Sequence, residues 1–161
     1  MRSLCVVIMS VIAIVSCGCS LLRSSGSTTA VSSGGKFVQK APDRSFTGER
    51  LRDYLGDGAE EFLLRGFIAL TVKQVEQPSI HKPVIVEIYQ MNSVRETRNI
   101  FVDRKGEEGK PAPVGDEGIR YEGGFLLIEA VRGDRYYRVF TYENALETRQ
   151  PLILVAQKII Q

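Results

Sequence analysis

Tryptophan is absent from this 161-residue sequence, histidine occurs once, and cysteine occurs three times. All three cysteines lie within the first 19 positions. The rest of the chain therefore has no residue for a disulfide, a thiolate nucleophile or a cysteine-ligated metal. With a single histidine as well, most metal and nucleophile chemistries lack the residues that they need.

No excess of positive charge is present either. The chain has 21 Lys and Arg against 19 Asp and Glu, for a net charge of +2, and after residue 45 the 16 basic residues face 18 acidic ones. A nucleic-acid-binding domain normally carries a clustered basic excess, so that function class is excluded. The length allows one domain with an ordinary buried core.

The N-terminal apolar run, Leu4 to Val15, is preceded by Arg2 as its only charge. At about a dozen residues it is shorter than a membrane span of ~20 and typical of a signal-peptide core. The run ends in I-V-S-C at Cys17, and this end resembles a bacterial lipobox. In that family of signals a peptidase cleaves before the cysteine, whose thiol carries diacylglycerol. The resemblance implies a signal peptide at 1–16 and a lipid on Cys17.

Alternatives to this interpretation remain. Cys19 follows Gly18 and is a second candidate for the lipid, although Ser16 would then occupy a position that favours Leu or Ile. An ordinary secretory signal or an uncleaved anchor helix would also fit the apolar run. The residue after Cys17 is Gly18 and not Asp. If the cell has two membranes, the resemblance to sorted lipoproteins therefore implies the outer membrane, facing the periplasm. We therefore expect a lipid-anchored protein of the cell envelope.

Residues 17–45 are predicted to form an acylated, flexible tether, because the stretch from Leu21 to Arg44 is rich in Ser, Gly and Thr. Such a composition cannot bury enough apolar surface to offset its ordering entropy. Four basic residues in it could lie against anionic lipid headgroups or simply be solvated. They are Arg23, Lys36, Lys40 and Arg44.

Four strands are predicted in a single domain over residues 46–161. Alternating apolar residues indicate strands from Phe67 to Glu76 and from Val84 to Tyr89. Two more are expected around Ile119 to Val131, with a bulge or bend at Gly123-Gly124, and from Arg135 to Tyr142. The sequence Arg132-Gly133-Asp134 is typical of the hairpin turn between them.

Three helical regions accompany these strands. Thr47 is a candidate N-cap for the first, and a capping box of Asp57 with Glu60 would restart it after a glycine interruption. Ser93 with Glu96 forms another capping box, and Pro151 suits the first turn of a last helix. The order α-β-β-α-β-β-α predicts an α+β fold, an antiparallel sheet of about four strands covered by helices.

Four motifs occur along this domain, in the order Tyr54 to Phe67, Val86 to Ser93, Gly115 to Gly118 and Arg135 to Tyr137. Together they resemble a family of uncharacterised exported bacterial proteins with the motif Y-I-N-G-G-A-E-x-Y followed by G-F. Four positions depart from the family's pattern: Gly56, Asp57, Gln90 and Asn92. The resemblance spans roughly residues 47 to 160 and implies a fold and export, but no activity.

Acidic residues are the first candidates for chemistry. Paired carboxylates can act as acid and base in glycoside hydrolysis or bind Ca²⁺. The spacing here fits neither an EF-hand loop nor a compact cluster, and helix capping and an exposed turn explain the same residues. The candidates are Asp57, Glu60, Glu61, Asp116 and Glu117.

His81 and a group of tyrosines are the remaining candidates. His81 has no serine, cysteine or second histidine nearby in the sequence, so an exposed loop position is expected. Tyr136, Tyr137 and Tyr142 alternate with Arg135 and Arg138 on the last strand. They could line a carbohydrate- or peptide-binding surface, and cross-strand packing would also explain them.

These observations leave three hypotheses. The first, which we favour, is a membrane-tethered, non-catalytic module that binds an envelope protein and needs no cofactor or metal. The second is a small-molecule or glycan binding module with a concave site lined by tyrosines. The third is a hydrolase that uses the acidic residues. The first hypothesis requires only a lipid anchor and a surface that binds a partner protein.

Overall fold

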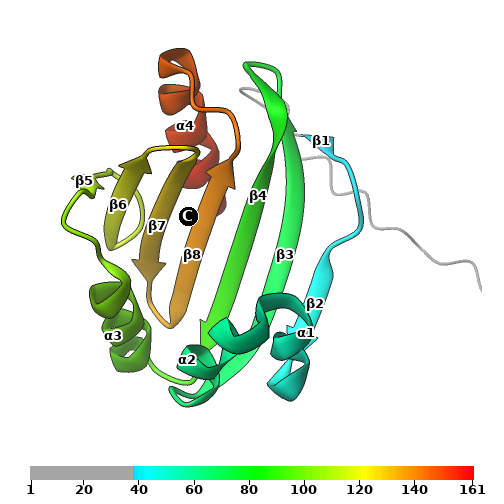
Figure 1. Cartoon of the computed structure of the whole chain (residues 1–161), viewed down its shortest axis with the longest axis vertical. Helices are drawn as coiled ribbons and strands as arrows, with labels where there is room; N and C mark the ends of the chain where they lie inside the picture. The colour runs from blue at the N-terminus through cyan, green and yellow to red at the C-terminus, as the bar shows by residue number, and fades with distance from the viewer. Residues whose placement is uncertain (1–37) are drawn as a thin grey trace, which may run out of the picture. The chain divides into compact units, whose positions relative to one another are not determined.

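The computed structural model describes residues 38–161, and these form an α+β domain around one antiparallel sheet. The central strands are β3 (Phe67–Gln77), β4 (Ile80–Met91), β8 (Arg135–Thr141), β7 (Leu126–Arg132) and β6 (Glu117–Glu122), in this spatial order (Figure 1). Short strands complete both edges. β1 (Val38–Gln39) and β2 (Arg44–Thr47) pair with β3, and β5 (Lys110–Pro111) pairs with β6.

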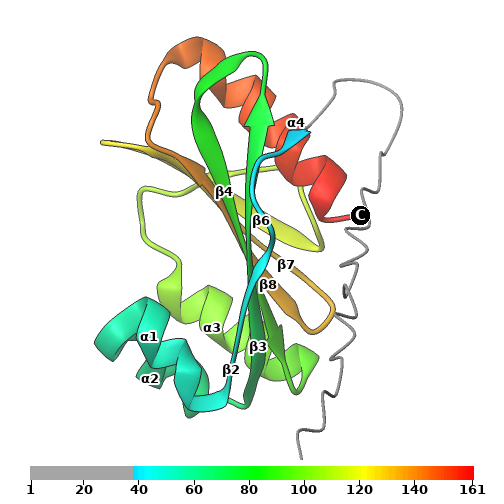
Figure 2. The same ribbon diagram turned by 90° about the vertical axis from the view of Figure 1, so that its right-hand side faces the viewer.

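Helices lie on both faces of the sheet (Figure 2). One face carries α1 (Arg52–Leu55), α2 (Glu60–Leu63) and α3 (Val94–Arg104), with the 3-10 turns η1 (Gly48–Leu51) and η2 (Gly56–Ala59). The other face carries α4 (Arg149–Ile159), preceded by η3 (Leu146–Thr148). None of the helices in the described part of the chain is long and apolar enough to cross a membrane.

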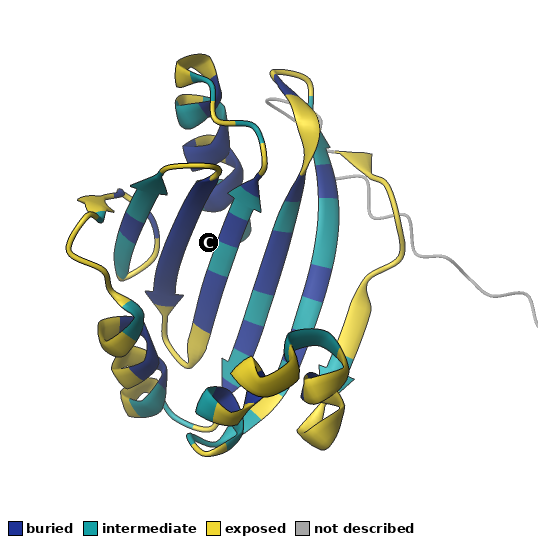
Figure 3. Ribbon diagram, in the orientation of Figure 1, coloured by how far each residue is buried: buried dark blue, intermediate teal, exposed yellow. Residues whose placement is uncertain are grey.

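Successive side chains along a strand point to opposite faces of the sheet, so the domain has one hydrophobic core on each face. On β4, Val84 and Val86 belong to the core under α4, whereas Tyr89 and Met91 belong to the core under the other helices. Because both faces are covered, β7 is buried along almost its whole length (Figure 3). This double coverage explains why its sequence is nearly continuous in apolar residues.

The predicted sheet of four strands in the order α-β-β-α-β-β-α is wrong, because the sheet has eight strands and the described chain starts with two of them. The strand predicted around residues 119–131 is two strands, β6 and β7, because the chain turns at Gly123-Gly124. The other three additional strands have two to four residues each. They are too short to produce an alternating pattern.

The start of the sheet also precedes the expected domain start at residue 46. Residues 38–45 lie in the stretch interpreted as a tether, yet they supply β1 and the first half of β2. Both strands are mostly exposed and pair through backbone hydrogen bonds with the edge of β3. Pairing at a sheet edge uses backbone groups and needs no apolar side chains. The composition of this stretch therefore did not predict these two strands.

Some of the predicted helix caps and turns are present in the structure, and others are not. Ser93 caps α3, since its hydroxyl accepts a 3.2 Å hydrogen bond from the backbone N–H of Glu96. Gly133, with a positive φ, and Asp134 form the predicted hairpin turn, and Pro151 lies in the first turn of α4. The caps predicted at Thr47 and Asp57 are wrong, because neither η1 nor η2 has a side-chain cap.

Candidate functional site

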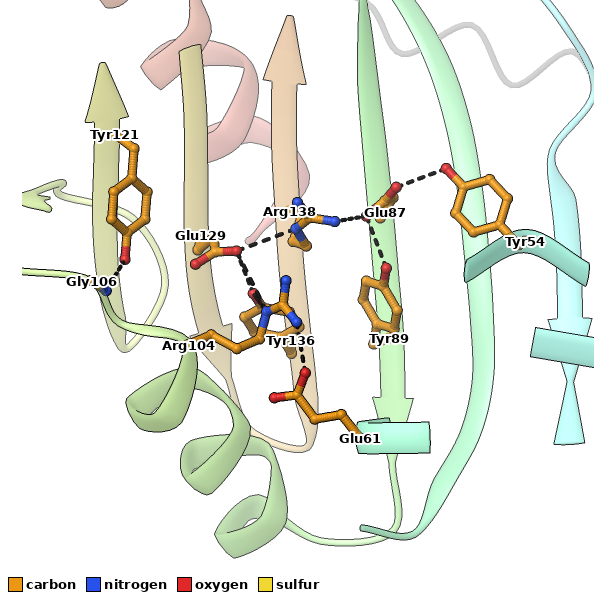
Figure 4. A network of polar contacts seen from close by, with 10 residues as sticks. All are labelled: Tyr54, Glu61, Glu87, Tyr89, Arg104, Gly106, Tyr121, Glu129, Tyr136 and Arg138. Atoms are coloured by element: carbon orange, nitrogen blue, oxygen red, sulfur yellow. Dashed lines mark hydrogen bonds and ion pairs between the residues drawn. The ribbon is translucent and has the colours of Figure 1, made fainter. Parts of the chain in front are cut away.

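Three charged residues lie side by side across the middle of the sheet. Arg138 on β8 is opposite Glu87 on β4 and, on its other side, opposite Glu129 on β7. The two glutamates are 3% and 4% exposed, which is unusual for carboxylates. We call Glu87, Arg138 and Glu129 the buried charge row (Figure 4).

The Arg138 guanidinium joins the two carboxylates. Its terminal nitrogen Nη1 donates to Oε2 of Glu87 over 2.9 Å, and Nε donates to Oε1 of Glu129 over 3.2 Å. Burial by itself lowers the pKa of Arg138, but the carboxylate of Glu87 and the other nearby groups raise it above its ordinary value. Arg138 is therefore a fixed positive charge between two negative ones.

Two tyrosines complete the surroundings of Glu87. The hydroxyl of Tyr54 on α1 donates to Oε1 over 2.7 Å, and that of Tyr89 on β4 donates to Oε2 over 2.9 Å. Burial, together with the adjacent carboxylate, raises the pKa of both phenols. Both tyrosines thus keep their protons and act as hydrogen-bond donors.

A second group of contacts surrounds Glu129. The hydroxyl of Tyr136 donates to Oε1 over 2.6 Å and accepts from Nε of Arg104 on α3 over 3.2 Å. Burial, followed by the negative charge of Glu129, raises the pKa of Tyr136 well above its ordinary value. Arg104 also donates to Glu61 on α2 over 2.7 Å, so the contacts extend from the sheet to two helices.

Burial and charge act in opposite directions on Arg104. Burial lowers the pKa of its guanidinium, whereas its contacts with Tyr136, Glu129 and Glu61 raise it overall. At the edge of the same face, the hydroxyl of Tyr121 accepts a 3.1 Å hydrogen bond from the backbone N–H of Gly106. This bond ties the loop after α3 to β6 (Figure 4).

The polar groups of this arrangement are satisfied. Among residues 38–161, the buried side-chain atoms without a hydrogen-bond partner belong to Gln77, Arg120, Glu122 and Arg149, all outside these contacts. Glu87 accepts hydrogen bonds from Arg138, Tyr54 and Tyr89, and Glu129 accepts from Arg138 and Tyr136, so both carboxylates are engaged by side chains of the chain itself. The chemistry supports a structural role, in which the charges select one pairing of β4, β8 and β7.

The acids singled out in the sequence do not come together in one hydrogen-bonded group. Glu60 forms an ion pair with Arg52, and Glu61 forms one with Arg104. Glu117 lies near two basic side chains, Arg98 and Lys105.

Asp116 accepts a hydrogen bond from the backbone N–H of Gly133 over 2.9 Å and so supports the β7–β8 turn. Asp57 lies in η2. In the described residues, no group of three or more His, Cys, Asp or Glu is placed to hold a metal ion.

His81 is exposed, as expected, but it has a partner. Its Nδ1 lies 3.1 Å from Oε1 of Glu143, and its backbone N–H donates to Oε2 over 2.6 Å. The hydrogen bond from His81 is the largest cause of the lowered pKa of Glu143, about 2, and the same bond raises the pKa of His81. These contacts join the start of β4 to the segment between β8 and η3.

The three tyrosines do not form one surface. Tyr136 and Tyr137 are buried in the cores on opposite faces of the sheet, and only Tyr142 is exposed. Arg135 donates to Gln90 on β4. Cross-strand packing therefore explains the alternation of Tyr and Arg along β8.

The described surface has at least two cavities, and neither of these two is lined by a tyrosine. The first, of about 450 Å³, lies between the segment after α2 and the start of α3. We call it the distal cavity, and its lining is Leu64, Arg65, Gly66, Asn92, Ser93, Arg95 and Glu96. The second, of about 340 Å³, lies between β1 and the β3–β4 turn.

Sequence reasoning missed Glu87 and Glu129, although a signal was present. Each is a buried carboxylate within an apolar stretch of its strand, Val84 to Tyr89 for Glu87 and Leu126 to Val131 for Glu129. A charge in such a position needs a buried partner, and that partner is on another strand. The predicted lipid sites, Cys17 and Cys19, lie outside the described residues.

Comparison with protein-family models, with curated proteins and with solved structures finds no match to this chain.

Proposed function

We propose that this chain is a lipid-anchored protein of the cell envelope whose domain binds a partner protein and catalyses no reaction. The lipobox-like end at Cys17 supports the anchor. The arrangement of the buried charge row carries the non-catalytic part of the proposal, because each of its charged groups is engaged by another side chain. The four sequence motifs that resemble a family of exported bacterial proteins point to the same location.

The distal cavity is the surface that fits a partner protein best. Leu64 beside it is 78% exposed, and Val94 at the start of α3 is 59% exposed. Arg95 also lines the cavity, with a side chain 84% exposed. Exposed apolar side chains around a concave site mark many protein interfaces, and Arg is enriched there. A partner with an apolar side chain over Leu64 and a carboxylate at Arg95 would complement this surface.

The distal cavity is far from the point at which the described chain starts. Phe67 on β3 pairs with Met91 on β4 next to the cavity, whereas Val38 pairs with Glu76 at the other end of β3. A lipid anchor N-terminal to Val38 would therefore leave the cavity accessible. This separation favours the distal cavity over surfaces close to β1.

The partner is tested by photocrosslinking in the host cell. A benzoylphenylalanine residue replaces Leu64 in one variant and Leu154, an exposed position on α4, in the control. We expect one crosslinked protein from position 64 and none from position 154. The crosslink should be lost when Arg95→Glu is added to the position-64 variant. Equal products from both positions would contradict a specific partner at this cavity.

The anchor is tested by mass spectrometry of the mature protein from membranes. We expect cleavage before Cys17 and a mass increase that fits acyl chains. Cys17→Ala should abolish this mass increase, whereas Cys19→Ala should leave it unchanged. The reverse result would move the lipid to Cys19, and a lipid-free mature chain would overturn the anchor.

A further inference from the structure

One end of the sheet gathers exposed apolar side chains that the proposed function does not use. Of the exposed large hydrophobic residues, Val38, Phe125, Tyr142 and Leu146 are 57%, 39%, 63% and 70% accessible. They belong to four different segments: β1, the β6–β7 turn, the end of β8 and η3. We call these four residues the proximal tip.

The strand register places these segments at the same end of the sheet. Gln39 on β1 pairs with Val75, which pairs with Val84, so β1 and the β3–β4 turn share this end. Leu126 pairs with Thr141, so the β6–β7 turn is next to the end of β8. Figure 1 shows β1, both turns and the start of α4 at the same end of the sheet, and Figure 2 shows that β1 and the β6–β7 turn lie on opposite sides of that end.

Contacts within the tip hold its aromatic rings in place. The rings of Phe125 and Tyr142 lie 6.3 Å apart, and each lies near the ring of Phe140, at 6.5 Å and 5.8 Å. The side chain of Asn144 donates to the carbonyl of Gly123, which ties the two aromatic segments together. The rings of Phe125 and Tyr142 thus form an exposed pair that packs against Phe140.

Charged residues surround this cluster. Nζ of Lys82 donates to the carbonyl of Tyr142 over 3.3 Å, and the side chain of His81 is 89% exposed. Lys40 pairs with Glu76, and Glu143 pairs with His81. Exposed aromatic rings beside lysine are the combination that membrane interfaces favour, because the rings lie among the headgroups and lysine pairs with phosphate.

The position at which the described chain starts points to the same end of the sheet. About 20 residues separate Cys17 from Val38, which span about 70 Å at full extension. A lipid on Cys17 would keep the domain within that distance of the bilayer, and the tip at Val38 is the end closest to it along the chain. Such tethering raises the effective concentration of membrane at the domain, so that a surface with low affinity for lipid can still remain bound.

We propose that the proximal tip lies on the lipid bilayer, with Phe125, Tyr142 and Leu146 at the level of the headgroups. This inference rests on the proposed anchor at Cys17 and deepens it, because it gives the domain a defined orientation. The distal cavity then points away from the membrane.

The absence of tryptophan from the chain allows a direct test. The full-length acylated protein is reconstituted in vesicles of phosphatidylethanolamine and phosphatidylglycerol, with Tyr142→Trp as the only tryptophan. Leu64→Trp, at the other end of the domain, is the matched control. We expect the emission of the Tyr142→Trp protein to shift to shorter wavelength and to be quenched several-fold more strongly by brominated lipids than that of the control.

The outcomes separate this inference from the anchor. Vesicle-bound protein with equal, weak quenching of both tryptophans would overturn the inference and leave the anchor in place. If the protein carries no lipid, the same variants are titrated with excess vesicles, and selective quenching of Tyr142→Trp would still support the tip. A blue shift that depends on protein concentration, without lipid quenching, would assign the tip to a second copy and overturn the inference.

Discussion

The hydroxyl of Tyr54 donates a 2.7 Å hydrogen bond to Oε1 of Glu87, 33 positions further along the chain. This bond joins α1 to the buried charge row on the sheet. The helix thus covers a carboxylate that would otherwise lack a donor at one of its oxygens.

Tyr54→Phe should therefore destabilise the domain. Loss of the donor leaves Oε1 of the buried Glu87 unsatisfied, at a cost of about 1–3 kcal/mol in the free energy of unfolding. Urea denaturation measures this difference. Tyr142→Phe removes the same atom from a side chain that is 63% exposed and should change stability by less than about 0.5 kcal/mol. Equal effects of the two variants would contradict a structural role for the Tyr54 bond.

Arg138→Met should be more damaging, because it leaves two buried carboxylates without their shared cation. Removal of one partner from a buried ion pair costs about 3–5 kcal/mol. Adding Glu87→Gln and Glu129→Gln should restore part of this loss, since neither buried carboxylate then lacks the cation that joined them. Arg135→Met on the same strand is the control, because the exposed side chain of Arg135 donates to the uncharged side chain of Gln90. A triple variant less stable than Arg138→Met alone would be evidence against this account.

The contact between His81 and Glu143 should make stability depend on pH. The bond raises the pKa of His81, so its stabilisation is complete below the ordinary pKa of 6.5 and is lost as pH rises through the raised value. For Glu143 the pKa is lowered to about 2, so its stabilisation is present above 4.5 and is lost as pH falls toward 2.

A single histidine makes this measurable by NMR, because one imidazole signal reports its titration. We expect a midpoint above 6.5, and Glu143→Gln should return it toward 6.5. Glu147 makes a smaller contribution, so Glu147→Gln should move the midpoint less. A midpoint that Glu143→Gln does not change would show that the two side chains do not interact in solution.

Ser93→Ala tests the one predicted cap that is present. It removes the acceptor for the N–H of Glu96 at the start of α3 and should cost about 1 kcal/mol of stability. Thr47→Ala is the matched comparison, because Thr47 precedes η1 without a side-chain cap bond and should have a much smaller effect. Chemical denaturation of the two variants distinguishes these cases, and a larger loss at Thr47 would refute the assignment.

Gly115 should tolerate alanine poorly. Its φ is +63°, which costs about 1–2 kcal/mol for a residue with a side chain, and a Cβ there would meet the carbonyl oxygen of Val131. Gly133 also has a positive φ, of +56°, but a Cβ there would meet nothing within 4 Å. Gly115→Ala should therefore lower the melting temperature more than Gly133→Ala. The opposite ranking would mean that the segment around Gly115 can move.

The sequence by itself determined the elements whose signals are local. Alternating apolar residues predicted β3 and β4, and a strand was also expected where β8 lies. Ser93, Gly133 and Pro151 indicated a cap, a turn and a helix start that the structure contains. Each of these depends on residues within one turn or one strand. The α+β class followed from the same local patterns.

Only the tertiary structure decided the strand count and the buried charge row. β1, β2 and β5 exist because a longer neighbour supplies hydrogen-bond partners, and their own residues contain no such information. Glu87, Glu129 and Arg138 come together through the register of three strands, and Tyr54 and Arg104 reach them from two helices. A buried charge is satisfied by whichever partner folding brings across the sheet, and contacts between distant segments cannot be read from local spacing.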